Sequence, residues 1–283
     1  YGLLFAIAMV LCIALAMCHA KHHNFDSNDI LDFFLWMIPL ILVGARIYYV
    51  IFEWDQFKGN WKSILNIRQG GLAFYGGVIG GIIAILVVAK VKKIKVHRPL
   101  DFLVVYVPLG QAIGRWGNFF NQEAFGTNTS LPWGMISEGT RQGLADLNPN
   151  PANPLPGLDP SLPVHPTFLY EFIANMVIFV ILIYVRKRVK RPWATLHSYL
   201  LLYGLVRFFV EGIRTDSLMF RLFDYDFRVS QVLSALMVLF SGVFLIAIYV
   251  RGRRRDRLVG SLAGVPSDVV EITESASKAE KNE

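Results

Sequence analysis

The sequence predicts an all-α polytopic membrane protein with seven transmembrane helices and a small irregular extracytoplasmic lobe. The chain has 283 residues, of which 54% are hydrophobic and 17% are charged. Soluble globular chains carry about 25% charged residues, and the mean hydropathy of this chain is +0.45. No single soluble core needs this much apolar sequence, so we place the chain in a bilayer.

Seven apolar runs are long enough, or nearly so, to cross about 30 Å of hydrocarbon. They cover residues 2–20, 31–52, 72–89, 99–114, 167–185, 195–212 and 229–250. The fourth run is the shortest, and it leads directly into a polar motif. We therefore expect the polar motif to lie where a spanning helix meets water.

The basic residues predict the orientation of these spans. Basic clusters follow the third, fifth and seventh runs, at residues 90–98, 186–191 and 251–257. Seven alternating spans put all three clusters on one side, which the positive-inside rule makes cytoplasmic. The N-terminus is then outside and the C-terminus is cytoplasmic. The net charge of +7 follows from this topology and does not indicate a nucleic-acid partner.

The same assignment divides the chain into a membrane domain, residues 1–257, and a tail, residues 258–283. Three segments of the membrane domain lie outside, at 53–70, 115–166 and 213–228, and the second is the extracytoplasmic lobe. The tail is rich in Ser, Glu and Lys and low in hydrophobicity, which predicts a disordered cytoplasmic segment.

Residues 114–123 carry the most informative motif, Gly-Arg-Trp-Gly-Asn-Phe-Phe-Asn-Gln-Glu. Ionisable groups near the membrane interior cost roughly 2.5–3.5 kcal/mol on insertion scales, so they usually have a function. Arg115, Asn118 and Gln122 share one face if the segment is helical. A permanent cation flanked by amides suits an anionic ligand that accepts hydrogen bonds, such as a phosphodiester.

A second polar group lies at the outer end of the sixth span. Arg207, Glu211 and Arg214 are spaced i, i+4 and i+7, so they share one helical face. One interpretation is an internal ion pair that makes an intramembrane arginine tolerable. The other is a second phosphate clamp in which Glu211 orients Arg207, and both can hold together.

Two further regions contribute polar candidates at the same membrane depth. His165 and Glu171 bracket the outer start of the fifth span, and Glu171 lies in an apolar stretch where it needs a partner. A metal site would need more ligands at helical spacing, and we find none.

Tyr75 lies at the outer mouth of the third span, where a belt anchor and a catalytic residue are equally plausible. Next to it, Gly76 with Gly80 and Gly77 with Gly81 form G-x-x-x-G pairs that let membrane helices approach closely.

These groups come from distant parts of the chain and fall at one depth on the outer side. We infer a polar cavity inside the bundle that opens towards the outer leaflet. Its chemistry is phosphate recognition with acid–base groups nearby, without a metal cluster or a nucleotide-binding loop.

The motif at 114–123 resembles the G-R-x-G-N-F-x-N-x-E pattern of the prolipoprotein diacylglyceryl transferases. Five further blocks match that family in the same order, and the resemblance covers about residues 1–250. They are Tyr1 to Leu3, Gly44 to Tyr49, Phe74 to Gly77, His165 with Pro166 through Tyr170 and Glu171, and Arg207 through Arg214.

The resemblance implies a bacterial enzyme of the cytoplasmic (inner) membrane whose active site faces the outer leaflet. It would move diacylglycerol from phosphatidylglycerol to the lipobox cysteine thiol of a prolipoprotein signal peptide, forming a thioether and releasing glycerol phosphate. Its partners are then these two substrates and the surrounding membrane lipids, and it needs neither metal nor cofactor. An anionic leaving group requires cations that stabilise the charge developing on it.

Roles carried over by position are as follows. Arg115 is the foremost candidate for the phosphatidylglycerol-headgroup ligand, and Arg207 is the second clamp. Asn118 and Glu123 shape the site, and Glu211 orients Arg207. Tyr1, Glu171, Arg214 and His165 are the weaker assignments.

The chain departs from the family pattern at Tyr75. Several members carry a histidine there, which has been proposed as the base, whereas tyrosine with a pKa near 10 is a poor base at neutral pH. We expect Tyr75 to orient the headgroup or the thiol, while Glu171 or Glu211 remains open as the proton acceptor.

The main alternative from another functional class is a transporter or flippase of an anionic lipid. Such folds predict discontinuous helices in repeated halves, which this sequence does not show. A second alternative is another phospholipid headgroup transferase. The metal-dependent versions need clustered aspartates in a helix, and the predicted spans contain no such cluster.

Overall fold

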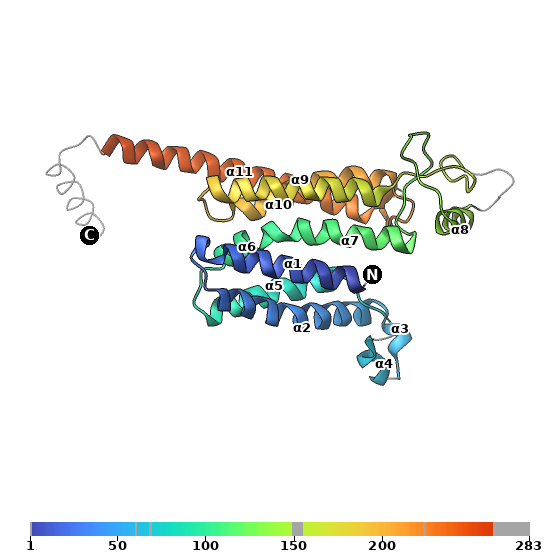
Figure 1. The fold of residues 1–283 in the computed structure, drawn as a ribbon, viewed down its shortest axis with the longest axis horizontal. Helices are drawn as coiled ribbons and strands as arrows, with labels where there is room; N and C mark the ends of the chain where they lie inside the picture. The colour runs from blue at the N-terminus through green and yellow to red at the C-terminus, as the bar shows by residue number, and fades with distance from the viewer. Residues whose placement is uncertain (1, 60, 68–69, 149–154, 223–224, 263–283) are drawn as a thin grey trace.

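The computed structural model describes residues 2–59, 61–67, 70–148, 155–222 and 225–262, and within them the chain is mostly helical (Figure 1). Six long helices each contain a stretch long and apolar enough to cross a membrane. They are α1 (Gly2–Ala20), α2 (Ser27–Phe52), α5 (Phe74–Val91), α9 (Thr167–Arg188), α10 (Ala194–Ile213) and α11 (Val229–Leu262). The expectation of an all-α polytopic membrane protein is therefore confirmed for six of the predicted spans.

The predicted fourth span, residues 99–114, is not a single helix. Three pieces follow one another here: α6 (His97–Leu103), the 3₁₀ turn η3 (Val104–Tyr106) and α7 (Val107–Asn121). Pro108 lies in the first turn of α7, where its missing N–H costs nothing. The helix then continues to Asn121, which corrects the predicted boundary at residue 115 and places Arg115 and Asn118 on a helix.

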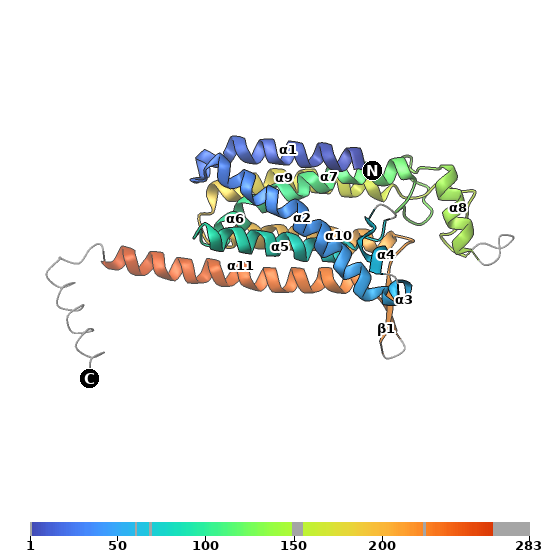
Figure 2. The same ribbon diagram turned by 90° about the horizontal axis from the view of Figure 1, so that it is seen from below.

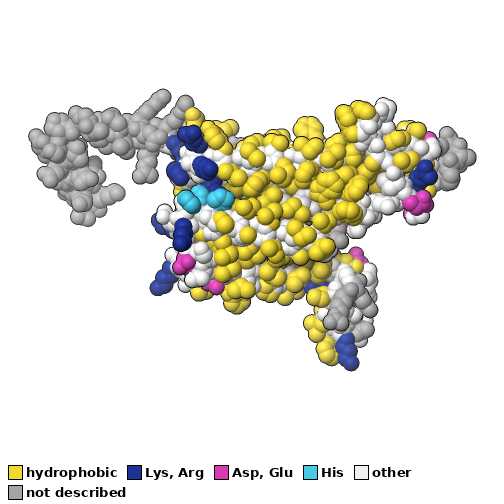
Figure 3. All heavy atoms as spheres, in the orientation of Figure 1, with side chains coloured by type: hydrophobic (Ala, Val, Ile, Leu, Met, Phe, Trp, Pro, Cys, Tyr) yellow, Lys and Arg dark blue, Asp and Glu magenta, His cyan; other side chains and the backbone are white. Residues whose placement is uncertain are grey.

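The long helices pack side by side in a fixed order. α2 packs against α5, α1 lies between α2 and α7, and α7 packs on α9, while α10 contacts both α9 and α11 (Figure 1). Apolar side chains cover the middle of the bundle's surface (Figure 3), and many of them are largely exposed, such as Leu3, Phe74 and Leu239. Lipid is the natural neighbour of such a surface.

Glycine sets the distance between α2 and α5. A Cβ on Gly44 would lie 2.5 Å from the carbonyl oxygen of Gly76, and one on Gly80 would collide with the backbone of Leu40. Gly77 and Gly81 have more room, since their nearest neighbours are Ile41 side-chain atoms at 3.4 Å. Gly76 and Gly80 are therefore the pair that brings the two backbones together.

The short elements at one end of the bundle coincide with the segments predicted to lie outside the bilayer (Figures 1 and 2). They are α3 (Trp54–Phe57), α4 (Trp61–Leu65), α8 (Glu138–Leu147) and an antiparallel hairpin of β1 (Met219–Leu222) with β2 (Tyr225–Arg228). Single bridges, Asn128 to Val164 and Met135 to Val164, tie the segment around α8 together. Thr140 and Ser137 cap α8 through a reciprocal pair of hydrogen bonds.

A buried arginine fixes the segment between α2 and α5. Arg46 is 8% exposed and donates hydrogen bonds to the backbone carbonyls of Ile64, Gly70 and Gly71, among others, at 2.7–2.9 Å. The loop has little regular secondary structure to satisfy its backbone carbonyls. The guanidinium of Arg46 supplies hydrogen bonds to several of them and so holds the loop in place.

The opposite end of the bundle holds η1 (Lys21–His23), α6 and the far end of α11. α11 continues to Leu262, past the predicted end of the span at 250 and into the first residues of the predicted tail. Residues 263–283, the rest of that tail, lie outside the described residues.

Candidate active site

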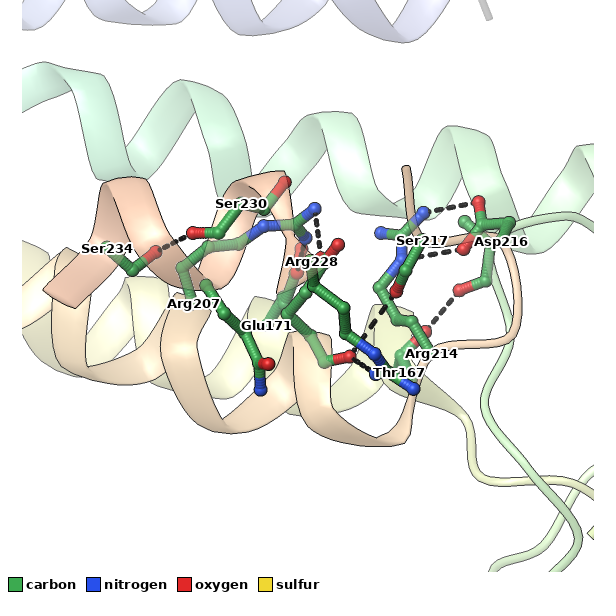
Figure 4. A network of polar contacts seen from close by, with 12 residues as sticks. Thr167, Glu171, Arg207, Arg214, Asp216, Ser217, Arg228, Ser230 and Ser234 are labelled. Carbon is green, nitrogen blue, oxygen red and sulfur yellow. Dashed lines mark hydrogen bonds and ion pairs between the residues drawn. The ribbon is translucent and has the colours of Figure 1, made fainter. Parts of the chain in front are cut away.

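Glu171 lies at the centre of a buried ionic network formed by three helices. It belongs to the second turn of α9, which begins at Thr167 directly after Pro166, and it is 1% exposed. One carboxylate oxygen accepts from Arg207 Nη1 of α10 at 2.7 Å (Figure 4), and the other pairs with Arg115 Nε of α7. A carboxylate buried this deeply is tolerated because two guanidinium groups neutralise it.

Arg207 has a second carboxylate partner one helical turn further along α10. Its Nη2 lies 2.6 Å from Glu211 Oε2, and Glu211 is also 1% exposed. Arg207 is thus held between two acids, each contacting a different terminal nitrogen. This leaves the guanidinium plane with little rotational freedom, which is the preorganisation that phosphate recognition requires.

Arg115 is supported from its own helix. Its Nη1 lies 3.4 Å from Asn118 Oδ1, and Asn118 in turn donates to Glu123 Oε1 at 3.1 Å. Asn118 is 8% exposed. The polar residues of the motif at 114–123 therefore form a chain that begins at the guanidinium and runs outward past the end of α7.

Gln122 does not continue this face, which corrects the predicted spacing. It adopts a left-handed conformation, with φ of 56°, and caps the C-terminus of α7. Its side-chain oxygen accepts a hydrogen bond from the backbone N–H of Gly139 at 2.7 Å. Gln122 thus ends the helix and fixes the start of α8.

Arg214 also leaves its predicted helical face. It caps α10 with an extended backbone and binds Asp216 through two nitrogens, at 2.8 and 2.6 Å. Burial raises the pKa of Asp216, and the hydrogen bonds and charge of Arg214 lower it by more, so that pKa lies below its ordinary value. A backbone bridge joins Arg214 to Gly126, so the pair links the end of α10 to the lobe.

Arg228 is a member of the network that sequence reasoning missed. It ends β2, and its Nη1 donates to the backbone carbonyl of Glu211 (Figure 4). A signal for it exists in the sequence: Arg228 is a cation in a segment that the predicted topology places outside, where the positive-inside rule disfavours one. The region brings together the arginines Arg115, Arg207, Arg214 and Arg228 and the acids Glu171, Glu211, Asp216 and Glu123. Arg115 and Arg207 are the two that share one carboxylate, which places them to meet an anion together.

A layer of uncharged polar side chains lies beneath the ionic network. The ring of Tyr203 stacks on that of Tyr199 with the ring centroids 5.5 Å apart, and Tyr199 donates to Gln111 Oε1 at 3.2 Å. Asn175, one turn from Glu171 on α9, is fully buried. Sequence reasoning missed these residues, because single polar residues in apolar helices give little signal without their neighbours.

The other predicted site residues contact residues outside the network around Glu171. Tyr75 stands in the first turn of α5, where its ring packs 6.4 Å from that of Tyr48, and no hydrogen bond within the described residues ties it to the network. His165 Nδ1 lies 3.0 Å from the Tyr170 hydroxyl, which also accepts from Trp133 at 2.9 Å. Tyr1 lies outside the described residues.

Comparison with known proteins identifies relatives of this chain. The family model described as prolipoprotein diacylglyceryl transferase matches residues 1–247. A phosphatidylglycerol–prolipoprotein diacylglyceryl transferase of Finegoldia magna is 43% identical over 246 residues, which cover 87% of this chain and 88% of the relative. Proteins of the same name from Clostridioides difficile and Listeria welshimeri are 38% and 40% identical, over 91% and 85% of this chain and 93% and 82% of their own lengths.

Proposed function

Because the chain belongs to the prolipoprotein diacylglyceryl transferase family, we propose that it transfers the diacylglyceryl group of phosphatidylglycerol to the lipobox cysteine thiol of prolipoproteins. The cysteine sulfur forms a bond to the terminal carbon of the diacylglycerol. The bond between that carbon and the phosphate oxygen breaks, and glycerol phosphate leaves. The proton that the thiol loses ends on the released phosphate group or in water, which balances the reaction. The observation that carries this proposal is the pair of arginines fixed on one buried glutamate.

Arg115 and Arg207 are the phosphate ligands in this proposal. Both guanidiniums are held by Glu171, at Nε of Arg115 and Nη1 of Arg207, so both are set relative to one point. A phosphodiester between them gains negative charge as its ester bond breaks, and fixed cations stabilise that charge without reorganising. The same positive field favours the thiolate form of the attacking cysteine.

The acidic residues position these cations. Both oxygens of Glu171 are engaged by arginine, and Glu211 is paired with Arg207. We therefore assign Glu171 and Glu211 to orientation of the clamp, with Asn118 and Glu123 supporting Arg115. Tyr75 orients the headgroup or the thiol, and His165 and Arg214 shape the substrate-binding surface near the lobe. Tyr1, carried over from the family pattern, is proposed to line the same site.

The proposed topology has seven crossings in the bacterial cytoplasmic membrane. α6, η3 and α7 together form the crossing that the sequence places at residues 99–114. The N-terminus and the lobe lie outside, the ionic network faces the outer leaflet, and the C-terminus is cytoplasmic. The placement of the basic clusters at one end of the bundle supports this orientation (Figure 3).

The test uses the purified protein in detergent with phosphatidylglycerol and a peptide that carries a lipobox cysteine. We expect mass spectrometry to show a diacylglyceryl adduct on the thiol, and a matched peptide with serine in place of cysteine to stay unmodified. The transporter alternative predicts no adduct, together with movement of labelled phosphatidylglycerol between the leaflets of protein-containing vesicles. That outcome would overturn the proposal.

A further inference from the structure

A second cationic site lies at the end of the bundle opposite the ionic network. A pocket of about 200 Å³ opens there between α6, the C-terminal end of α9 and the N-terminal end of α10. Lys, Arg and His side chains gather at this end of the molecule (Figure 3). The pocket is lined by the cations Arg98, Arg186, Lys190 and Arg191, with Asp101 as its only carboxylate within the described residues.

The carboxylate of Asp101 accepts hydrogen bonds from the start of α10. Its two oxygens accept from the backbone N–H groups of Trp193 at 2.6 Å and Leu196 at 2.8 Å, which caps the N-terminus of α10. Asp101 supplies one negative charge against the positive charges of Arg98, Arg186 and Lys190, so the described lining keeps an excess of positive charge. This arrangement differs from an ordinary solvated loop cluster, because the charges surround a concavity between helices.

Arg186 shows most directly that a ligand is expected. It is 6% exposed, and its guanidinium lies 5.1 Å from the Phe102 ring. Its Nη1 donates to Phe102 O at 3.3 Å and to the Tyr106 hydroxyl at 3.2 Å. Its Nε is buried without a hydrogen-bond partner, and no acid pairs with it among the described residues. A buried unpaired cation is costly, and an anion removes that cost.

We propose that this pocket binds a phosphate group, either the headgroup of an anionic phospholipid or inorganic phosphate. Arginine and lysine are the usual phosphate ligands, and basic pockets between membrane helices hold anionic headgroups. The apolar part of the lining, Phe25 and Phe102 among others, fits the start of the acyl chains of such a lipid. The site is separate from the transferase network. Its location in the cytoplasmic leaflet rests on the proposed topology, whereas the binding itself does not.

Native mass spectrometry of the full protein in detergent tests this, with phosphatidic acid as the lipid probe. The protein carries Arg115→Ala, so that the outer site does not contribute. We expect retained phosphatidic acid, and binding at least about tenfold weaker in Lys190→Gln combined with Arg98→Gln. The matched control is Lys93→Gln with Lys95→Gln, which removes equal charge from exposed positions outside the pocket. It should retain the lipid.

A single variant and a second probe complete the design. Arg98 also donates to backbone carbonyls, so Lys190→Gln is measured alone, because Lys190 is exposed and makes no hydrogen bond within the described part of the chain. Millimolar inorganic phosphate is then added in place of lipid. Protection against thermal unfolding by phosphate, lost in the pocket variants, supports the site with free phosphate as its source. Equal lipid retention and equal phosphate response in pocket and control variants would overturn the proposal. Transfer to the lipobox peptide is measured separately, in protein that keeps Arg115, and it reports on the outer site alone.

Discussion

Glu171 connects residues that are far apart in the sequence, and its position explains why the network is buried. Arg115 and Arg207 approach it from α7 and α10, and each arginine has an additional partner on its own helix, Asn118 or Glu211. Neither arginine therefore depends on Glu171 alone for its position. The glutamate instead sets the distance between the two guanidinium groups, and this distance decides whether one phosphate can bind both of them.

Replacement of Glu171 tests this at the residue scale. Glu171→Gln removes the buried charge that pairs with two partly buried guanidiniums, and we expect the free energy of unfolding to fall by up to about 3–5 kcal/mol, with a large loss of transfer. Thermal unfolding in detergent measures the first effect. Glu138→Gln is the control, since Glu138 lies exposed on α8 and its carboxylate accepts a hydrogen bond from the exposed side chain of Gln142. An unchanged unfolding temperature in Glu171→Gln would contradict the central position of this residue.

Tyr75 gives a second test, because the structure places it against Tyr48. Tyr75→Phe keeps the ring and loses the hydroxyl. If Tyr75 orients a substrate and does not accept the thiol proton, transfer should fall by less than about tenfold, equivalent to one modest hydrogen bond. The rate of adduct formation on the peptide measures this. Complete loss of transfer with intact lipid binding would show that the hydroxyl takes part in the chemistry.

The elements differ in how far the sequence predicted them. The contact between Arg207 and Glu211 follows from their spacing on one continuous helix, so periodicity was enough to predict it. Gln122 and Arg214 were expected on the same faces as their neighbours, but both lie at helix ends where the backbone changes direction. The break at η3 was also missed, since an apolar run reads the same whether it forms one helix or two.

Helix packing gives the prediction at the element scale. Gly80→Ala places a methyl group against the Leu40 backbone of α2, whereas the atom nearest to the methyl group of Gly77→Ala is Ile41 Cγ2, at an ordinary contact distance of 3.4 Å. We expect Gly80→Ala to destabilise the protein by about 1–3 kcal/mol, and Gly77→Ala to have a much smaller effect. Thermal unfolding of the two variants in detergent compares them. Equal stability would mean that α2 and α5 do not depend on close backbone contact.

At the scale of the whole molecule, charge is separated between the two ends of the bundle. One end holds the network around Glu171, where cations and acids are paired. The other holds the basic clusters that sequence analysis used for orientation, including the pocket around Arg186. The charge clusters in the sequence predict membrane depth and side, and both stay predictions. The pairing of Arg115 with Glu171 could not be predicted from the sequence, since it depends on how α7 and α9 pack.

The proposed orientation is tested by labelling in intact cells. Arg141→Cys, exposed on α8 of the lobe, should react with a membrane-impermeant maleimide from outside. Lys93→Cys, exposed at the other end of the bundle, should react only after the membrane is permeabilised. Both variants are made with Cys12 and Cys18, the free cysteines, replaced by serine. The reverse pattern would contradict the topology.

The most direct test of the account is a double-mutant cycle on the two arginines. The rate of adduct formation on the lipobox peptide is measured for Arg115→Ala, Arg207→Ala and the double variant, with phosphatidylglycerol as donor. If both arginines act as one clamp on a single phosphate, each single variant loses most of the activity, and the double variant is about as slow as the slower single one. Losses that multiply independently, or near-normal turnover in either single variant, would contradict the joint clamp centred on Glu171.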